Sequence, residues 1–451
     1  MRYLPHSDED IRAMLASIGE ANVDALFKSI PESLRLGRAL NLPDGLSEPE
    51  LMAHLTELSS DAPASTKVSF LGGGLYAHHL SPAVDQILLR SELYTAYTPY
   101  QPEVSQGTLQ VIFEFQTMIC RLFGMGYANA SMYDGASAAA EAALMARRVT
   151  KKRNRILVSE GLHPEYIETI RTYLTASDNG TPDLEIVPID PVTGKTDMEA
   201  LRAVLDDRIA AVLVGYPNFF GVVEDLDEIA TATHEAGALT VSVTMDPYAL
   251  GTMAAPGTLG ADIAVGEGQP VAVPLSFGGP GLGLFACRED KSFLRQLPGR
   301  LVGKTKDVHG QPGFVLTLST REQHIRREKA TSNICTNHGL CALAATVQLT
   351  LLGREGFKEV SQLCLSKTAY LKQGISSLEG FSIAFNGPVF NEFVVRCENA
   401  KAADVLSKLD FLGGIDLGRF RTEWDDLFLC AVTELNTKAQ MDAFIDALKS
   451  L

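Results

Sequence analysis

The sequence predicts an α/β fold with a mostly parallel central sheet, an N-terminal helical arm and a small C-terminal α+β domain. Between Val68 and about Ala345, short apolar segments alternate with helical ones. Continuous apolar strands between helices are typical of a parallel sheet that is covered on both faces. After residue 350 the pattern changes to segments in which apolar and polar side chains alternate. The predicted parts are therefore residues 1–65, 66–345 and 346–451.

The first part, the arm, predicts two amphipathic helices. Ser7 and Asp10 form a capping-box pattern at the start of the first helix. The second helix begins near Ser47 and carries Pro49 in its first turn, where a missing N–H does no harm. The turn-rich residues 41–45 join the two helices. Packing on a partner subunit and packing on the chain's own core are equally compatible with such an arm.

The central part contains five apolar segments that are predicted strands. The clearest helix between them is 226–236, because Gly237 can adopt the left-handed conformation of a helix C-cap. The last strand is predicted to return beside its neighbour, as in a hairpin. The five predicted strands are 155–158, 209–214, 239–243, 261–265 and 282–286.

The C-terminal part follows a long helix that starts near Gly339. Residues 381–385 and 393–396 alternate like half-exposed strands, whereas residues 427–430 are continuously apolar and predict a buried strand. A last helix is predicted over 437–448. These elements predict a small α+β domain.

Composition limits the classes of function. A net charge of −16 argues against a general binder of nucleic acid or anionic membranes, and no apolar segment approaches the ~18 residues of a membrane span. The first six residues show no signal peptide. Seven dispersed cysteines suit buried free thiols in a reducing compartment, so we expect a cytoplasmic protein. For Cys335 and Cys341 we prefer two small buried side chains over a metal or redox pair.

Neither the histidines nor any short catalytic motif indicates a function. His78 and His79 have no carboxylate or cysteine partner at ligand spacing, so no metal site is predicted. The sequence contains no nucleophile elbow, phosphate loop or dinucleotide fingerprint.

A missing lysine is the most informative feature. No lysine occurs between Lys195 and Lys291, a window that contains GEGQP (266–270) and then FGGPG (277–281). This layout is similar to that of enzymes that use pyridoxal phosphate (PLP), at the point where a lysine holds the cofactor. Gln269 cannot form a Schiff base, because its amide nitrogen is not a nucleophilic amine. The chain is therefore predicted to be an enzyme's partner rather than a self-sufficient enzyme.

Two further segments fit such a cofactor site. In Ser131–Ala142, a loop of small and polar residues leads into an alanine-rich helix. The first N–H groups of such a helix form an anion site, which in PLP enzymes holds the cofactor phosphate. A plain N-cap with close helix packing is the alternative, and it is favoured for this segment alone. His163, just after a predicted strand, could stack on a pyridine ring; without context, a surface histidine or one satisfied within the protein is favoured.

Two polar segments remain. Tyr97–Gly107 holds two prolines and two tyrosines, and such a rigid polar loop suits a substrate cleft or a subunit interface. In Thr320–Asn333, alternating charges favour an exposed helix surface over a carboxylate clamp. The candidates for a shared cleft or interface are Tyr97, Tyr100, Gln101, Glu103 and Gln106.

Four segments closely resemble the P-protein of the glycine cleavage system, and most closely the first chain of its two-chain form. The resemblance covers essentially the whole chain. The four segments are 96–107 (AYTPYQPEVSQG), 128–142 (ANASMYDGASAAAEA), 265–270 (VGEGQP) and 320–336 (TREQHIRREKATSNICT).

The resemblance implies a fold type I PLP-transferase-like fold and a role in glycine decarboxylase. That enzyme removes the carboxylate of glycine as carbon dioxide and passes the aminomethyl group to the lipoyl arm of the H-protein. The resemblance also implies a sibling chain that carries the PLP lysine and assembles with this one as α2β2, so this chain is not expected to hold PLP. The open alternatives are an independent PLP-dependent lyase that uses another lysine, such as Lys304, and a purely structural scaffold.

Anchored on the turn at 278–281, the resemblance places the sibling's lysine at Gln269. It places the aspartate that pairs with the pyridine nitrogen near Ser242, and Asp246 is then four residues too late. The vestigial cofactor pocket implied in this way consists of Asp134, Gly135, Ala136, Ser137, His163, Ser242 and Gln269.

Overall fold

The structure is a computed structural model that describes residues 5–60, 62, 66–177, 180 and 182–451. Residues 1–4, part of the segment in which no signal peptide is predicted, and residues 63–65, at the predicted end of the arm, lie outside the described residues. The chain divides into two compact units, Met1–Ser65 and Thr66–Leu451.

The first unit contains the two predicted helices, α1 (Asp8–Ile18) and α2 (Glu48–Ser60). The Ser7 hydroxyl accepts the Asp10 N–H at 3.2 Å, and the Asp10 carboxylate accepts the Ser7 N–H at 2.8 Å, which confirms the predicted capping box. Leu15 is the one buried side chain among the described residues of this unit. Between the helices lie two 3-10 helices, η1 (Val23–Phe27) and η2 (Glu32–Leu34).

The second unit is built around a seven-stranded sheet with the order β1-β7-β6-β5-β4-β2-β3. Pairing is parallel from β6 through β3, while β7 runs antiparallel to both of its neighbours. The mostly parallel sheet and the hairpin-like return of its last strand are therefore confirmed. The strands are β1 (Tyr127–Ala128), β2 (Arg155–Ser159), β3 (Leu184–Val187), β4 (Ile209–Gly215), β5 (Leu239–Thr244), β6 (Ile263–Glu267) and β7 (Gly283–Cys287).

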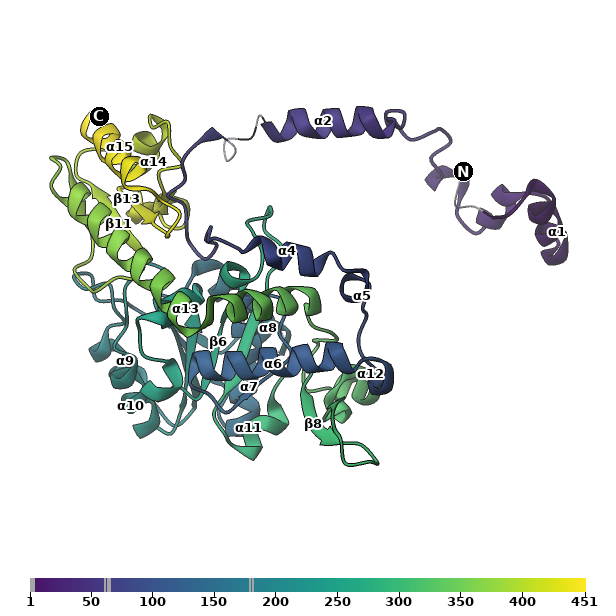
Figure 1. Cartoon of the computed structure of the whole chain (residues 1–451), viewed down its shortest axis with the longest axis horizontal. Coiled ribbons are helices and arrows are strands. Elements are labelled where there is room, and N and C mark those ends of the chain that lie inside the picture. The colour runs from purple at the N-terminus through teal and green to yellow at the C-terminus, as the bar shows by residue number, and fades with distance from the viewer. Residues whose placement is uncertain (1–4, 61, 63–65, 178–179, 181) are drawn as a thin grey trace. The chain divides into compact units, whose positions relative to one another are not determined.

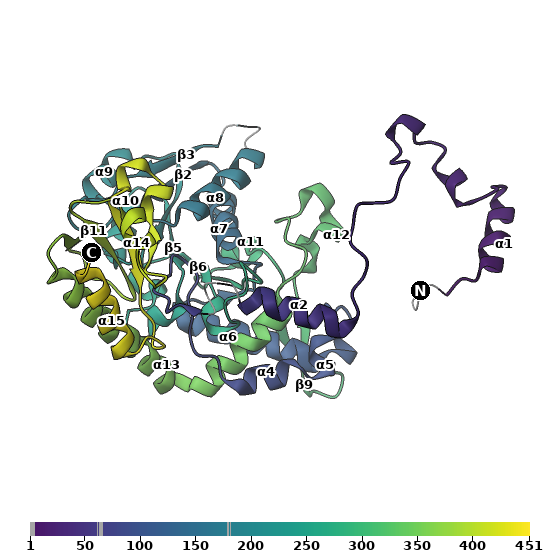
Figure 2. The same ribbon diagram turned by 90° about the horizontal axis from the view of Figure 1, so that it is seen from above.

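Helices cover both faces of this sheet. On one face, α7 (Gly135–Thr150) packs against the strands from β4 to β7 and beside α8 (Pro164–Ser177). On the other face lie α6 (Gln106–Phe123), α10 (Leu226–Glu235) and the first part of α13 (Gly339–Ser376). Figure 2 shows α7 and α8 on one side of β5 and β6, with α6 and α13 on the other.

Side chains along each central strand alternate between two cores. In β4, Ala211 and Leu213 join the core beneath α7, whereas Val212 and Val214 join the core beneath α10. Every residue of β4 is buried. A strand covered on both faces needs apolar side chains at every position, which explains the continuous apolar segments of the sequence.

A second, antiparallel sheet lies near the C-terminus, in the order β10-β11-β13-β12. Strand β13 is buried along its length, as predicted. The prediction that residues 393–396 are half-exposed is wrong, because Phe393 and Val394 enter two different cores on the two faces of β11. The strands are β10 (Phe381–Ile383), β11 (Glu392–Cys397), β12 (Ile415–Asp416) and β13 (Leu427–Ala431).

Helix α13 connects the regions of the two sheets (Figure 1), and it bends at Gly353, whose φ of 58° and ψ of −171° are not helical. The predicted boundary between 345 and 346 falls inside this helix. Moreover, Phe70 stacks on Phe444 with ring centroids 4.4 Å apart, and its N–H donates to the Leu412 carbonyl at 2.8 Å. The start of the second unit thus belongs to the C-terminal core, and the division into 66–345 and 346–451 stays a prediction.

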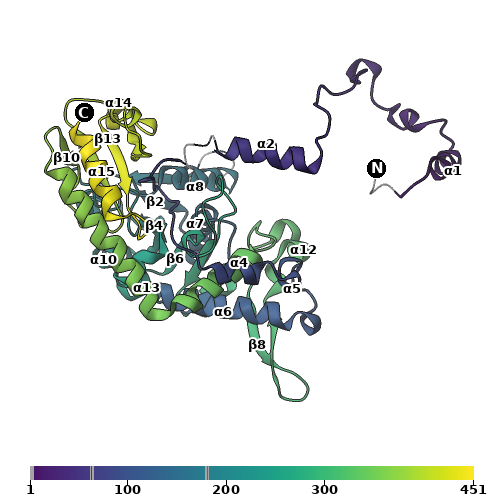
Figure 3. The ribbon, with the colours of Figure 1, turned by 45° about the horizontal axis from the view of Figure 1, so that its top comes forward.

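A two-stranded hairpin, β8 (Val302–Lys306) and β9 (Pro312–Leu316), extends away from the large sheet (Figure 3). Among the described residues, no helix is long and apolar enough to cross a membrane. The remaining α-helices are α4 (Pro82–Leu88), α5 (Ser91–Tyr94), α9 (Met198–Val204), α11 (Lys291–Gln296), α12 (Gln323–Arg326), α14 (Ala402–Ser407) and α15 (Lys438–Lys449), the last of which confirms the helix predicted over 437–448.

Candidate functional site

A cavity of about 230 Å³ lies beside the start of α7 and the residues that follow β6. Four of the seven residues predicted for the vestigial pocket line it: Asp134, Ala136, His163 and Gln269. Its other walls come from several distant segments. They are Gly73, Gly74, Leu75, Glu165, Tyr166, Glu267, Pro274, Leu275, Ser276, Gly278, Gly279, Pro280 and Gly281.

Gln269 sits in the 3-10 turn η6 (Gln269–Val271), directly after β6, and is 4% exposed. Its amide oxygen accepts the Tyr76 N–H at 3.3 Å. Its amide nitrogen donates to the Tyr76 carbonyl at 3.3 Å and to the Val273 carbonyl at 2.7 Å. The side chain therefore pairs with the backbone as a second peptide group would, and it joins two segments far apart in the sequence.

The start of α7 shows the N-cap that was the alternative to an anion site. The Asp134 carboxylate accepts the Ser137 N–H at 2.7 Å, and the Ser137 hydroxyl accepts the Asp134 N–H at 3.3 Å. Gly135 begins the helix, and its N–H donates to a carboxyl oxygen of Glu267 at 2.9 Å. Neither Gly135 nor Ser137 lines the cavity.

Glu267 is a site residue that the sequence reasoning missed. It ends β6, two residues before Gln269, and is 4% exposed. Its other carboxyl oxygen accepts the N–H groups of Leu282 at 2.7 Å and of Gln269 at 2.9 Å. Burial raises the pKa of Glu267, and the backbone N–H groups of Leu282, Gly135 and Gln269 oppose that rise. An acidic residue beside the lost lysine is the signal that could have drawn attention to it.

His163 is held by two hydrogen bonds. Its Nε2 donates to the Gly73 carbonyl at 2.9 Å, and its Nδ1 accepts the Glu165 N–H at 3.1 Å. Because one nitrogen donates and the other accepts, the ring is neutral, and burial lowers its pKa further. The edge of the ring meets Phe219 with centroids 4.8 Å apart. The structure thus shows the satisfied histidine that was the favoured alternative.

Ser242 does not line the cavity, contrary to its predicted place in the pocket. It is buried in the middle of β5, with Val214 and Ala264 as its neighbours on the adjacent strands. The side chain of Asp246, beyond the end of β5, accepts a bond from Asn391 Nδ2 at 2.6 Å and lines no part of this cavity.

PLP, which the resemblance implies for this fold, needs an amine for its Schiff base and a seat for its phosphate. Among the described residues that line the cavity, none is a lysine. The amide of Gln269 is bonded to the backbone, and Glu267 accepts the first N–H of α7, that of Gly135. The residues present do not fit the cofactor.

Comparison with known proteins shows the family of this chain. The family model described as glycine cleavage system P-protein matches residues 1–448. The chain belongs to the glycine cleavage system P-protein family. A protein of Sorangium cellulosum, named probable glycine dehydrogenase (decarboxylating) subunit 1, is 52% identical over 451 residues, covering 99% of both chains. A protein of the same name from Bacillus mycoides is 48% identical over 453 residues, covering 100% of this chain and 99% of the relative.

Solved structures confirm the fold. A crystal structure of glycine decarboxylase (P-protein) of the glycine cleavage system, in inhibitor-bound form, superposes with a TM-score of 0.88 at 43% identity and full coverage of both chains. Glutamate decarboxylase of Lactobacillus brevis, 14% identical, superposes with a TM-score of 0.68 over 94% of this chain. That second likeness concerns the fold alone. The predicted fold type I transferase-like architecture is therefore confirmed for this P-protein family member.

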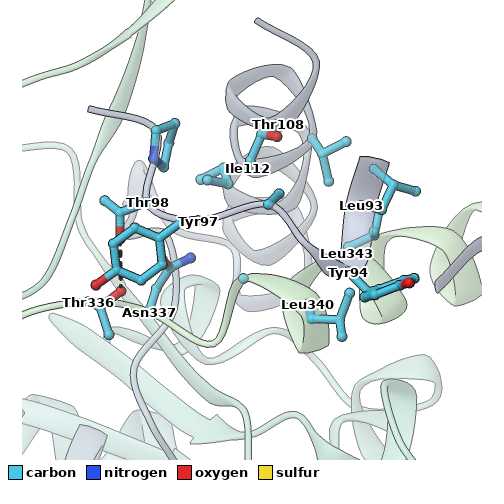
Figure 4. A pocket seen from close by; sticks show the side chains of 14 residues that line it. Leu93, Tyr94, Tyr97, Thr98, Thr108, Ile112, Thr336, Asn337, Leu340 and Leu343 are labelled. Atoms are coloured by element: carbon cyan, nitrogen blue, oxygen red, sulfur yellow. Dashed lines mark hydrogen bonds between the residues drawn. The ribbon is translucent and has the colours of Figure 1, made fainter. Parts of the chain in front are cut away.

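The loop Tyr97–Gly107 borders an apolar cavity of about 250 Å³ between α5, α6 and the start of α13 (Figure 4). Tyr97 is 84% exposed. Thr98 is anchored to Thr336 by a hydrogen bond of 3.4 Å between their hydroxyl groups, drawn in Figure 4. The lining residues are Leu93, Tyr94, Ala96, Tyr97, Thr98, Pro99, Thr108, Val111, Ile112, Thr336, Asn337, Gly339, Leu340 and Leu343.

Two side chains of this loop are fixed within the chain. The guanidinium of Arg300 lies over the Tyr100 ring, 4.9 Å from its centroid, and also donates to the Tyr100 hydroxyl at 3.0 Å. Gln106 donates to the carbonyls of Pro102 at 2.7 Å and Phe314 at 2.9 Å, and accepts the Phe314 N–H at 2.9 Å. Gln106 thereby ties the loop to strand β9. Gln101 and Glu103 are exposed.

The charged segment Thr320–Asn333 is mostly exposed, as predicted, with α12 as a single turn. Arg321 is half-buried. Its guanidinium donates to the carbonyls of Leu297 and Gly299, the second at 3.2 Å, so this arginine supports the backbone before β8 rather than clamping a carboxylate.

His78 belongs to a buried cluster that spacing along the sequence could not reveal. Its Nδ1 lies 2.7 Å from a Glu434 carboxylate oxygen, and its Nε2 lies 3.1 Å from an Asp246 carboxylate oxygen. Although burial opposes the charge, these carboxylates and Cys364 hold the pKa of His78 well above its usual range. His78, Cys364 and Glu434 bring three potential metal ligands within 4.8 Å, but the ion pairs already engage both ring nitrogens.

All seven cysteines are free thiols. Cys335 is exposed and Cys341 is buried, so the expectation of two buried side chains is wrong for Cys335. Its N–H donates to the Tyr133 hydroxyl at 3.1 Å, which holds this part of the chain at the surface.

Glu392, at the start of β11, makes the stability of the fold depend on pH. It is 1% exposed, and its carboxyl group accepts the Gly73 N–H at 2.5 Å and the Tyr76 hydroxyl at 2.6 Å. Burial, with a smaller effect from Asp246, raises its pKa from 4.5 to about 7, although both hydrogen bonds lower it. The folded state thus binds the proton more tightly, so Glu392 costs stability as the pH rises through this interval.

Glu392→Gln keeps the shape of the side chain and removes the ionisation. Relative to the wild type, we expect the variant to gain about 3 kcal/mol in the free energy of unfolding between pH 4 and pH 8. Urea unfolding at both pH values measures the difference. Glu398→Gln, just beyond the end of β11 and exposed, is the control and is expected to show no such gain. A difference between wild type and Glu392→Gln that is the same at both pH values would contradict the assignment.

Proposed function

We propose that this chain is subunit 1 of a two-chain glycine decarboxylase, in which it does not hold PLP. The proposal is carried by Gln269, whose amide stands at the predicted Schiff-base position and is bonded to the backbone of Tyr76 and Val273. The names of its relatives support it, because they are described as subunit 1 of a decarboxylating glycine dehydrogenase.

In this proposal two kinds of chain form an α2β2 assembly in the cytoplasm and perform different parts of the reaction. The partner carries the lysine that holds PLP, glycine is decarboxylated there, and the aminomethyl group passes to the lipoyl arm of the H-protein. This chain supplies a matching fold, the surfaces that hold the assembly together, and part of the cleft.

The loop Tyr97–Gly107 is our proposed contribution to the shared cleft. Tyr97, Gln101 and Glu103 are exposed, and Tyr100 is presented by Arg300 in a fixed orientation. An exposed tyrosine at the rim of an apolar cavity offers large contact area with little loss of side-chain entropy. Because all three of its hydrogen bonds are internal, we assign Gln106 to positioning this loop.

Activity in each combination of chains tests the division of labour. We expect neither this chain nor its lysine-bearing relative alone to release carbon dioxide from glycine at the rate of the co-expressed pair. Decarboxylation by this chain alone, or full activity of the relative alone, would show that the proposal is wrong. Treating this chain with PLP and borohydride should leave no trapped lysine adduct. Lys304, the alternative lysine, is exposed on β8 and lines no part of the cavity.

Substitutions in the assembled pair separate a shared cleft from a scaffold. Tyr97→Ala and Gln101→Ala are expected to lower turnover while the two chains still copurify. Val192→Ala, at another exposed apolar position, serves as the control and should leave turnover unchanged. Unchanged turnover in all three variants, with assembly intact, would favour the scaffold.

A further inference from the structure

The carboxyl group of Glu267 accepts the first N–H of helix α7. Three N–H groups from three separate segments meet it: Gly135 at the helix start, Gln269 after β6, and Leu282 before β7. We propose that Glu267 fills the phosphate seat of this fold from within, and that removing its carboxyl group opens a site for a phosphate monoester in this chain.

The start of α7 has N–H groups that could bind an anion, but acidic side chains of this chain accept those of Gly135 and Ser137. Helix α7 is 16 residues long, and its dipole favours a negatively charged or strongly accepting group at its first N–H groups. Backbone N–H groups that converge on one oxygen-bearing group bind phosphate in the same way. In this chain a side chain of its own accepts all three bonds, at 2.7–2.9 Å.

Gly281 packs closely against Glu267 on one side, while the cavity of about 230 Å³ lies on another. A Cβ atom at Gly281 would lie 3.1 Å from the Glu267 carboxyl oxygen and 2.8 Å from the Asp134 side chain. The Asp134 carboxylate, which caps the same helix, adds a second acidic group next to the seat. A phosphate group in the cavity could not accept these three N–H groups while the Glu267 carboxyl group holds them.

This inference goes beyond the proposed function. The loss of a lysine removes only the covalent link to PLP and would leave the phosphate seat intact. A filled seat removes the non-covalent part of cofactor binding as well. It would hold whether or not another chain carries PLP.

Glu267→Ala tests the seat in the full-length chain, with Glu224→Ala as the matched control. Glu224 is also buried, at 3% exposure, and its carboxyl group also accepts a backbone N–H, that of Thr196 at 2.9 Å. It lies before α10 rather than at the start of α7. The two substitutions therefore remove similar groups, but only one of them empties the seat.

Calorimetric titration with inorganic phosphate and with pyridoxal 5′-phosphate gives the readout. We expect Glu267→Ala to bind both at least about tenfold more tightly than the wild type and Glu224→Ala, a change of ~1.4 kcal/mol. Equal binding by all three proteins would overturn the inference. Tight binding of pyridoxal 5′-phosphate by the wild type would overturn both this inference and the proposed function. Equally weak binding by all three proteins would overturn the inference alone, so the two failures are distinguishable.

A second measurement covers the case in which Glu267→Ala does not fold in plain buffer. Phosphate or formate should replace the missing carboxyl group and raise its refolding yield or thermal midpoint, with no comparable effect on Glu224→Ala. An absence of this rescue would overturn the inference.

Discussion

His78→Ala is expected to lower the free energy of unfolding by about 3–5 kcal/mol, because it leaves two buried carboxylates without their cation. The side chain of His78 is fully buried, between Asp246 at 3.1 Å and Glu434 at 2.7 Å. This loss is a large share of the ~5–15 kcal/mol that stabilises a typical folded domain. Urea unfolding at neutral pH measures it.

His79→Ala is the matched control, since it changes the neighbouring histidine. His79 is exposed, and only its backbone N–H, which alanine retains, contacts Glu434, at 2.7 Å. Its loss is expected to stay within about 0.5 kcal/mol. Equal losses in the two variants would mean that the ion pairs of His78 contribute no net stability.

Gly221→Ala is expected to cost about 4 kcal/mol or to prevent folding. Gly221 adopts a φ of +78°, and an added Cβ would collide with the backbone carbonyl of Glu392 on β11. Backbone atoms of two packed segments cannot rotate away as a flexible side chain can, so the strain of the left-handed conformation is joined by overpacking. The yield of folded protein and its denaturation midpoint provide the measurement.

Gly310→Ala separates the two causes. Gly310 has nearly the same φ, +79°, but no described atom lies within 4 Å of an added Cβ. Only the conformational cost of about 1 kcal/mol should appear there. If both variants lose the same stability, the close approach of Gly221 to β11 is not what requires a glycine.

The sequence predicts five of the seven strands of the central sheet, because each of those five carries its own evidence. It misses β1, which has two residues, and β3, which is mostly half-buried. Residues 209–214 are apolar at every position, and such a segment between helices has few other solutions than a buried parallel strand. For β11, the same reasoning failed because the second face of the strand is covered by residues distant in the sequence, and alternation alone cannot reveal that cover. The assignment of Gln269 to the lost Schiff-base position stays a prediction, because it rests on the resemblance anchored on the turn at 278–281.

The missed residues depend on long-range contacts. Glu267 acts on Gly135, which lies 132 residues earlier, and His78 meets Glu434, which lies 356 residues later. Neither pair has a spacing rule, because the fold alone sets the distance between its members. Ser242 does not reach the cavity because it lies in the middle of β5, not at the carboxyl end of the sheet. A difference of a few residues along a strand decides between the two places.

Within the first unit, nothing covers the apolar stripe of helix α2: Leu51, Met52, Leu55 and Leu58 are each 44–59% exposed. A helix of 13 residues that buries no side chain within its own unit is marginal by itself, because ordering its backbone costs about 1–2 kcal/mol per residue. The fraction of chains in which α2 is helical therefore depends on what binds to the stripe. Any surface that covers this stripe adds RT ln(1 + [L]/Kd) to the apparent stability. The thermal midpoint of helix α2 then rises with the concentration of the molecule that carries this surface. The helical content of α2 therefore depends on that concentration as well as on the sequence.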